Sequence, residues 1–408
     1  MISSLEGGGS ERQAVLLLEK LDRVRFAPEL YLLRKTGSLL GRVPADVPIH
    51  SFAESAGADA QGWFHLPGAV HRAQISHVSD ILRQRGIDVV YDRTFHMTLI
   101  AAPAAQQCGI PRVSTIVSPP SRAVPLNAGR FLAIKRRRLR SGYRSAAAVI
   151  AVSGPTARDA ATYYGLSRQA FTVIPNPVDA ESLDAIVAQS PRPRRDERFT
   201  IACVGRMSVE KGQVDLLKAA ECLARSHPDF PMPNFWMIGD GPLRASFEHA
   251  IDSLRLRDHF EFIGHVEQPA VWVAAADAVC IPSHFEGFPN VMLEAMALGI
   301  PVIARSIDVT RSLGRLASDP AVRGRDYVAT FTGSGIALAD KIRRVRLNTT
   351  GTRSRVLAAR RLARESLSPD KIVPKIELLL TKAMVHSGPG VTSNYNRHHD
   401  DHESNSLP

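Results

Sequence analysis

Short apolar segments that alternate with helical ones, twice along the chain, constrain the fold of this sequence more than any other feature. Short apolar runs bounded by turn residues are typical of buried strands, and apolar residues at helical spacing are typical of helices. In the first half the predicted strands are 86–91, 112–117, 147–152 and 171–174, with helices over 12–21 and 71–85. In the second half they are 199–204, 234–238, 259–263 and 278–281, with a helix over about 213–226. This alternation indicates an α/β fold with parallel sheets and crossover helices.

A charged, proline-rich segment at 190–195 separates the two halves and is typical of a linker. A chain of 408 residues is also too long for one simple hydrophobic core. We therefore expect two domains.

The composition is that of a soluble globular protein, with 44% hydrophobic and 22% charged residues. No apolar run is long enough for a transmembrane helix, and the N-terminus lacks the basic-then-apolar pattern of a secretory signal. The four cysteines, Cys108, Cys203, Cys222 and Cys280, lie far apart among apolar neighbours. We expect them to be reduced thiols of a cytoplasmic protein, because their spacing does not suit a metal site.

The formal net charge of +11 is locally strongest at 130–144, which holds seven basic residues and no acidic one. Leu132, Leu139 and Tyr143 fall near one face of a helix there, so the segment could make peripheral contact with an anionic membrane. A solvated helix face is the competing interpretation. Nucleic acid is not expected as a partner, because no recognised binding motif or aromatic interleaving accompanies the charge.

The stretch 283–304 carries the clearest chemical signal. Two carboxylates, Glu286 and Glu294, stand eight positions apart across a Gly-Phe-Pro turn that follows a buried strand. A helix is expected to start near Asn290 and to end before Gly299. Free backbone amides at a helix start suit an anion, and carboxylates suit sugar hydroxyls as hydrogen-bond acceptors. A site that binds phosphate and hydroxyls together is what a nucleotide sugar requires.

The run from Ser283 through Pro301 resembles the E-x7-E signature of the large group of retaining glycosyltransferases known as group 1 or family 4. Members of that group have the GT-B fold, in which two Rossmann-like domains face each other across a cleft. The resemblance covers roughly residues 2–385 and is densest from 199 to 304. It implies the following division of the chain: an N-terminal acceptor-side domain over 1–178, a nucleotide-sugar-binding domain over 179–368, and a helix over 369–386 that packs back toward the first domain. The tail at 387–408 is rich in Ser, Asn, His and Asp, and we expect it to be disordered.

In this family the sugar donor binds the second domain. Arg206 and Lys211 stand in the two cationic positions of the family, where they would bind the donor diphosphate and stabilise it as it leaves. By resemblance, Glu286 contacts hydroxyls of the donor sugar and Glu294 those of the ribose. The further donor-binding positions that the resemblance implies are Gly205, Gly239, Phe288, Pro289, Asn290 and Val291.

The chain begins with the end of a strand that runs into a glycine-rich loop and a helix. Gly8 and Gly9 lie in this loop, which resembles the family loop that closes over the diphosphate. A Rossmann-like domain requires several more apolar residues before the loop, and only Ile2 to Leu5 are present. We therefore expect either a start codon assigned too late or a truncated first strand.

Residues 88–96 resemble the family segment D-V-V-H-x-H-x-x-H. This chain keeps His96 but has Tyr91 and Arg93 at the two earlier histidine positions. The active-site histidine of the family commonly falls where Arg93 stands, so we expect its role to pass to Arg93 or His96. An arginine cannot act as a base at neutral pH, but it can stabilise charge.

The resemblance implies transfer of a sugar from a nucleotide-diphospho-sugar to a hydroxyl acceptor, with retention at the anomeric carbon. The acceptor is expected to be a glycan or lipid-linked precursor in cell-envelope or exopolysaccharide synthesis. We expect a cytoplasmic protein with peripheral contact at the inner membrane face. No cofactor and no metal are expected beyond the nucleotide-sugar co-substrate.

Two rival classes stand beside this interpretation. A non-catalytic GT-B-like protein that binds nucleotide sugars would fit the short first strand and the missing histidine at position 93. The full set of Arg206, Lys211, Glu286 and Glu294 argues against it. A nicotinamide-dependent enzyme would require G-x-G-x-x-G and an acidic residue some twenty positions later, which this chain lacks.

Overall fold

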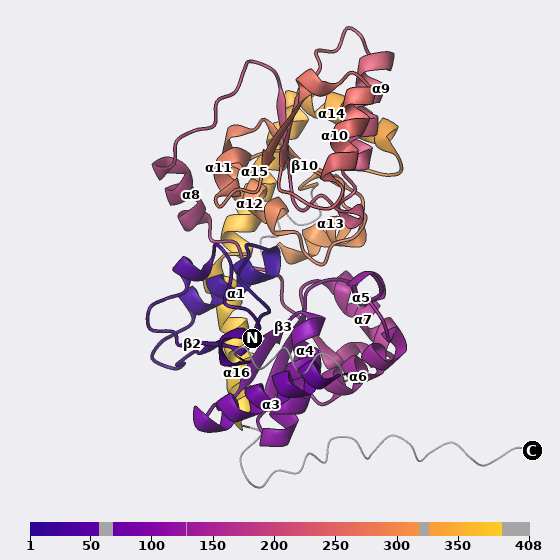
Figure 1. The fold of residues 1–408 in the computed structure, drawn as a ribbon. Coiled ribbons are helices and arrows are strands. Elements are labelled where there is room, and N and C mark those ends of the chain that lie inside the picture. Colours follow the sequence, from indigo (N-terminus) through magenta and orange to yellow (C-terminus); the bar gives the residue numbers. More distant parts are fainter. Residues whose placement is uncertain (57–67, 128, 318–325, 386–408) are drawn as a thin grey trace, which may run out of the picture.

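The computed structural model describes residues 1–56, 68–127, 129–317 and 326–385, which form two α/β domains on either side of a cleft (Figure 1). This arrangement confirms the predicted GT-B fold. The expected disorder of 387–408 lies outside the described residues.

The first domain is built on a parallel four-stranded sheet of order β3-β4-β5-β6, and a parallel pair of strands, β1 and β2, lies beside it. The strands are β1 (Leu30–Leu32), β2 (Ile49–Ser51), β3 (Val90–Arg93), β4 (Arg112–Ile116), β5 (Ala148–Ala151) and β6 (Phe171–Val173). The α-helices are α1 (Gly9–Lys20), α2 (Phe52–Ala56), α3 (Ala69–Gln84), α4 (Phe95–Cys108), α5 (Pro120–Asn127), α6 (Leu132–Arg144) and α7 (Gly154–Tyr164).

Residues 1–5 lie between β1 and β3 and join the two sheets of the first domain. The Ile2 amide donates to the Tyr31 carbonyl at 3.1 Å, and the Arg93 amide donates to the Met1 carbonyl at 3.3 Å. Ile2 and Leu5 are buried. The few apolar residues before the glycine loop therefore occupy the place of a central strand.

The second domain is built on a parallel six-stranded sheet of order β12-β11-β10-β7-β8-β9. Its strands are β7 (Thr200–Val204), β8 (Asn234–Ile238), β9 (Phe260–Gly264), β10 (Ala278–Ile281), β11 (Val302–Arg305) and β12 (Ala329–Phe331). Its α-helices are α9 (Val214–Ser226), α10 (Arg244–Ser253), α11 (Pro269–Ala275), α12 (Asn290–Leu298), α13 (Asp308–Ser312), α14 (Gly335–Leu347) and α15 (Thr349–Arg361), and α8 (Ala180–Gln189) follows the crossing from the first domain.

The last described helix, α16 (Pro369–Val385), returns to the first domain and runs along it (Figure 1). Its buried residues Ile372 and Ile376 share a core cluster with Leu17 of α1 and Ile150 of β5. The Asp22 amide donates to the carboxylate of Glu377 on α16 at 2.9 Å. The C-terminal helix is thus part of the core of the first domain.

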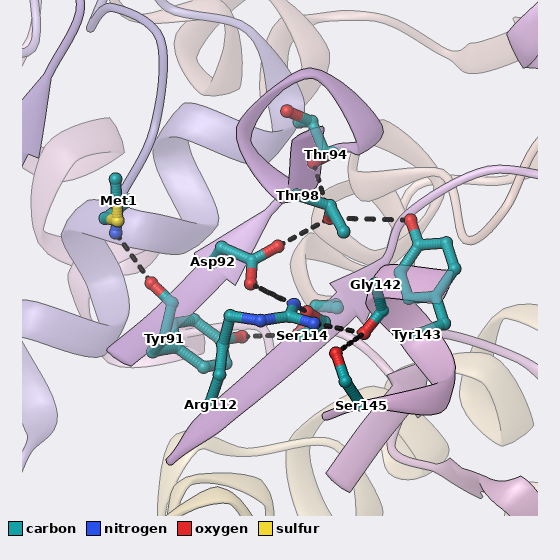
Figure 2. A network of polar contacts seen from close by, with 11 residues as sticks. Met1, Tyr91, Asp92, Thr94, Thr98, Arg112, Ser114, Gly142, Tyr143 and Ser145 are labelled. Carbon is teal, nitrogen blue, oxygen red and sulfur yellow. Dashed lines mark hydrogen bonds and ion pairs between the residues drawn. The ribbon is translucent and has the colours of Figure 1, made fainter. Parts of the chain in front are cut away.

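A buried polar network fixes two helices onto β3 and β4 (Figure 2). Asp92 accepts hydrogen bonds from Thr98 of α4 at 2.6 Å and from Arg112 of β4 at 2.8 Å. Arg112 also donates to the Gly142 carbonyl of α6, and Ser114 donates to Asp92 at 2.6 Å. Since Asp92 and Arg112 are almost fully buried, each charge depends on the other for compensation.

Two sequence-based expectations about local structure need correction. The strand predicted at 86–91 begins only at Val90, because the Ile87 amide caps α3 by donating to the Leu82 carbonyl. The apolar side chains of the basic helix do not form one exposed face, because Leu139 and Tyr143 are buried in the core of the domain. None of the described helices is long and apolar enough to cross a membrane.

Candidate active site

The carboxyl ends of strands from both sheets border a single cleft of about 570 Å³ between the domains. Val117 follows β4, whereas Gly205, Gly239 and Pro282 follow β7, β8 and β10. Parallel α/β sheets bind their ligands outside the carboxyl ends of the strands. The cleft is therefore where a substrate of either domain is expected.

The loops that border the cleft need glycine at two positions in particular. Gly239 has φ +124°, and a Cβ atom there would lie 2.3 Å from the Gly205 carbonyl oxygen. Gly212 has φ +66°, and its Cβ would lie 2.3 Å from the Pro282 carbonyl oxygen. Both glycines allow neighbouring loops to approach at backbone distance.

Lys211 and Glu286 form an ion pair within the cleft. The Lys211 ammonium lies 2.6 Å from Oε1 of Glu286. Burial alone lowers the pKa of Lys211, but the Glu286 carboxylate outweighs that effect, so the pKa lies above its ordinary value. Lys211 is therefore a permanent cation at neutral pH.

Glu294 carries an unsatisfied carboxylate oxygen in the first turns of α12. Its Oε2 atom is buried and has no hydrogen-bond partner within the described structure. Burial raises the pKa of Glu294, while Arg12 and Arg42 of the first domain lower it in part. A buried acceptor without a partner is costly, so this oxygen is suited to a ligand that brings hydroxyl donors.

The structure brings most of the predicted donor-site residues together. Those that line the cleft are Gly8, Gly9, Gly205, Arg206, Lys211, Gly239, Glu286, Phe288, Pro289, Asn290, Val291 and Glu294. Asn290 is the first residue of α12, with Pro289 at the N-cap position. Glu286 lies on the loop before the helix, and Glu294 lies inside the helix, as the sequence predicts.

Two predicted catalytic residues lie elsewhere among the described residues. The Arg93 guanidinium is buried and donates to Tyr91 Oη at 3.1 Å and to Asn176 Oδ1 at 3.2 Å. His96 packs on Phe95 with the ring centroids 3.9 Å apart, and burial lowers the pKa of its imidazole. Neither side chain is among the residues that line the cleft.

Among the further polar side chains that line the cleft, and that the motifs did not single out, are Arg12, Asn176 and Gln213. Arg12 of α1 donates to the carbonyls of Gly7 and Glu267, both at 3.1 Å, so it bridges the two domains. The Oε1 atom of Gln213 is buried without a partner in the described structure. Arg12 and Gln213 each follow a glycine-containing loop closely, which is the one signal in the sequence that marks them.

Comparison with known families accounts for most of the chain. Residues 7–182 match the family model "Glycosyltransferase Family 4", and residues 188–355 match "Glycosyl transferases group 1". The two matches meet between β6 and β7, where the chain passes from one domain to the other.

Curated relatives are similar at moderate identity. The chain is 29% identical over 292 residues to a 2-deoxystreptamine glucosyltransferase of Streptomyces kanamyceticus, covering 59% of this chain and 73% of that protein. It is 30% identical over 150 residues to the lipopolysaccharide core biosynthesis glycosyltransferase LpsD of Rhizobium meliloti, covering 37% of this chain and 40% of LpsD.

Solved structures share the fold over nearly the whole chain. The Anabaena protein HepE in complex with UDP-glucose superposes with a TM-score of 0.70 at 20% identity, covering 93% of this chain and 98% of HepE. A sucrose-phosphate synthase from Thermosynechococcus elongatus superposes with a TM-score of 0.71 at 18% identity, covering 94% and 96%. From its two matching domains and its shared architecture, the chain belongs to the glycosyltransferases of the GT-B fold.

Proposed function

We propose that this protein transfers a sugar from a nucleotide-diphospho-sugar to a hydroxyl acceptor and that the anomeric configuration is retained. The observation that carries the proposal is the joint placement of Arg206, Lys211, Glu286 and Glu294 on one cleft, with Glu294 Oε2 unsatisfied. Cations suit the diphosphate, and carboxylates suit hydroxyls of the sugar and the ribose.

The donor diphosphate would bind between Arg206, Lys211 and the start of α12. Asn290 and Val291 at the start of that helix line the cleft, and a helix start favours an anion. As the bond from the anomeric carbon to the phosphate oxygen breaks, negative charge develops on the diphosphate. Fixed cations and amides stabilise this charge and so lower the barrier.

The Lys211–Glu286 ion pair suggests how both charges are compensated in the site before the donor binds. Without a ligand each group compensates the other at 2.6 Å. When the donor binds, Lys211 would turn to the diphosphate, and Glu286 would accept hydrogen bonds from the sugar hydroxyls. The exchange leaves neither charge unpaired, which keeps the desolvation cost of binding low.

Retention would occur on one face of the sugar, without a covalent intermediate on the protein. The acceptor oxygen bonds to the anomeric carbon on the side from which the diphosphate leaves, and the acceptor proton passes to the departing phosphate oxygen. The transition state would resemble an oxocarbenium ion, as in other glycoside chemistry.

The relatives support the donor class. HepE was solved with UDP-glucose bound, and the Streptomyces relative is described as a glucosyltransferase. A nucleoside diphosphate sugar is accordingly the donor that we propose for this chain.

The acceptor we propose is a glycan or lipid-linked precursor in cell-envelope or exopolysaccharide synthesis. LpsD, which matches part of the chain, acts in lipopolysaccharide core biosynthesis by its description. A peripheral contact with anionic lipid would use the exposed start of α6 rather than one helix face. Phe131 and Ile134 are 68% and 51% exposed there, beside the basic residues of 130–144, and Leu126 near the end of α5 is 52% exposed.

The first test is calorimetric titration of the protein with a panel of nucleoside diphosphates and the corresponding nucleotide sugars, without added metal. Micromolar binding of one nucleotide, lost in Glu294→Ala and Arg206→Ala, is expected. No binding to any member of the panel by folded protein would refute the donor site. Binding without turnover on any tested acceptor would favour a non-catalytic sugar-nucleotide-binding protein. The anomeric configuration of the product, determined by NMR, tests retention.

The membrane contact is tested with vesicles. Sedimentation with vesicles containing about 30% anionic lipid is expected to fall several-fold for the double variant Phe131→Ser and Ile134→Ser, because both apolar anchors are lost. The matched control is Leu347→Ser, an equally exposed apolar residue of α14 in the other domain. Equal sedimentation of all three proteins would contradict the contact.

A further inference from the structure

We propose that Arg93 and Asn176 are positioning residues that act through Asn290, and we call Arg93, Asn176 and Asn290 the interdomain clasp. The clasp holds the first turn of α12, and with it the diphosphate end of the donor site, against the first domain. The inference rests on the proposed function, since it takes the start of α12 to be the diphosphate site.

The side chain of Asn290 joins the two domains through hydrogen bonds. Its Nδ2 atom donates to the Gly9 carbonyl at 2.8 Å. Its Oδ1 atom accepts from Asn176 Nδ2 at 2.9 Å and from Gln13 Nε2 at 3.3 Å. Both ends of the Asn290 amide are therefore engaged by residues of the first domain or of the chain crossing.

Asn176 holds the loop before α12 as well as the helix itself. It is buried, and its Nδ2 atom also donates to the Phe288 carbonyl at 3.2 Å. Its Oδ1 atom accepts from Arg93 Nη2 at 3.2 Å. Asn176 lies three residues after β6, where the chain leaves the first domain. It therefore couples the position of that domain to the loop before α12.

Arg93 anchors the clasp to the sheet of the first domain. It ends β3, is 4% exposed, and donates to Tyr91 Oη, which in turn accepts from Thr115 of β4 at 2.8 Å. In the described structure, the two side chains that accept hydrogen bonds from its guanidinium are neutral, and its Nε atom is buried without a partner. A buried guanidinium makes a strong, directional hydrogen bond, so it fixes the Asn176 amide in one orientation.

The backbones around the clasp lie in close contact. A Cβ atom on Gly287 would lie 1.9 Å from the Val117 carbonyl oxygen, and one on Gly9 would lie 2.8 Å from Asn290 Nδ2. The loop before α12 and the first residue of that helix thus contact the first domain on both sides of Phe288. Arg93 accordingly affects the donor site without reaching the cleft, which explains its place away from the cleft lining.

The clasp is tested first in the unliganded protein by hydrogen–deuterium exchange. Asn176→Ala and Arg93→Lys are expected to speed exchange at least about tenfold in peptides that cover 286–293, because each variant breaks the chain of hydrogen bonds. The control is Ser114→Ala, a buried polar substitution in the same domain outside the clasp. Unchanged exchange at 286–293 in both variants would overturn the proposal whether or not the protein binds a nucleotide.

Ligand binding gives the second measurement. Asn176→Ala is expected to weaken nucleoside diphosphate binding about tenfold, and Arg93→Lys less. The variant with both changes is expected to bind as weakly as Asn176→Ala alone, because Arg93 acts only through Asn176. Effects that multiply would show that the two residues act separately and would refute the clasp. A wild-type protein that binds no nucleotide would instead refute the donor site, leaving the exchange result to decide on the clasp.

Discussion

Glu294 shows how a binding residue can reduce the stability of the protein that carries it. Its carboxylate oxygen is buried without a partner in the described structure, and burial raises its pKa. A carboxyl group whose pKa is higher in the folded state loses stability as the pH rises from the unfolded-state pKa through the folded-state pKa. The loss is therefore complete above the folded-state pKa, where the carboxylate is ionised.

The variant Glu294→Gln is accordingly expected to melt a few degrees higher than wild type at about pH 8, and the difference is expected to vanish near pH 4. At the same time it should bind nucleotides at least about tenfold more weakly, because one charged acceptor is lost. Thermal melting at both pH values and calorimetric titration check the two parts. A lower melting temperature at about pH 8 would show that the carboxylate is satisfied in the folded protein.

Loss of the Glu286 carboxylate is expected to affect a nucleoside diphosphate and the corresponding nucleotide sugar differently. In Glu286→Gln, Lys211 loses its ionic partner and is free for the diphosphate, so binding of a nucleoside diphosphate should be unchanged or tighter. Turnover of the nucleotide sugar should fall about 100-fold, because a charged contact to the sugar is lost. Titration with both ligands and a steady-state assay separate these effects. Equal weakening of both ligands would mean that Glu286 does not act on the sugar.

At the scale of elements, the buried pair of Asp92 and Arg112 is expected to dominate the stability of the first domain. Removing one partner leaves an uncompensated buried charge, so Arg112→Leu should lower the free energy of unfolding by about 3–5 kcal/mol. Denaturant titration followed by circular dichroism measures the loss. The control is Arg225→Leu, an exposed residue whose partner Glu221 lies one turn away, with an expected change below about 0.5 kcal/mol.

The elements that the sequence predicted best are those whose own residues form a clear hydrophobic pattern. In the second domain, strands β7 to β10 start and end within a residue or two of the predicted bounds, because they are short, largely apolar runs, whereas β11 and β12 were not predicted. Strands β1 and β2 were not predicted. Each has three residues, and they are held in place by pairing with each other and with residues 1–3, far away in the chain.

The same distinction holds for the site. The positions of Glu286 and Glu294 could be predicted because they belong to one loop and helix whose spacing is visible in the sequence, and that of Lys211 because it belongs to the loop that follows β7. Asn176 and Arg12 could not, since their contacts arise only when the two domains approach each other. Arg93 was predicted to act in the active site, but it ends β3 and turns into the interior, where its partner Asn176 lies on the chain crossing.

At the scale of the whole molecule, the approach of the two domains depends on a glycine. Gly287 has no room for a methyl group, since a Cβ would lie 1.9 Å from the Val117 carbonyl oxygen. Gly287→Ala is expected to push the domains apart and to lower turnover about ten- to a hundredfold, the effect of a few kcal/mol of overpacking. Steady-state rates and the radius of gyration from X-ray scattering measure both effects.

The matched control for that substitution is Gly41→Ala, where a Cβ meets nothing within 4 Å. It should leave both the rates and the radius of gyration unchanged. Wild-type rates in Gly287→Ala would show that the closed arrangement is not needed for catalysis.

The chain crosses between the domains twice, once after β6 and once before α16, and the two crossings lie side by side. The Val178 amide of the first donates to the Leu367 carbonyl of the second at 2.8 Å. Two crossing segments that are hydrogen-bonded to each other at one point can act as a hinge between the domains. Rotation of one domain about these segments keeps the hydrogen bond between Val178 and Leu367, whereas sliding of one domain past the other would break it. An opening of the cleft by rotation would break the hydrogen bonds of the clasp but keep the one between the two crossings, so the domains would return to the same register when the clasp re-forms.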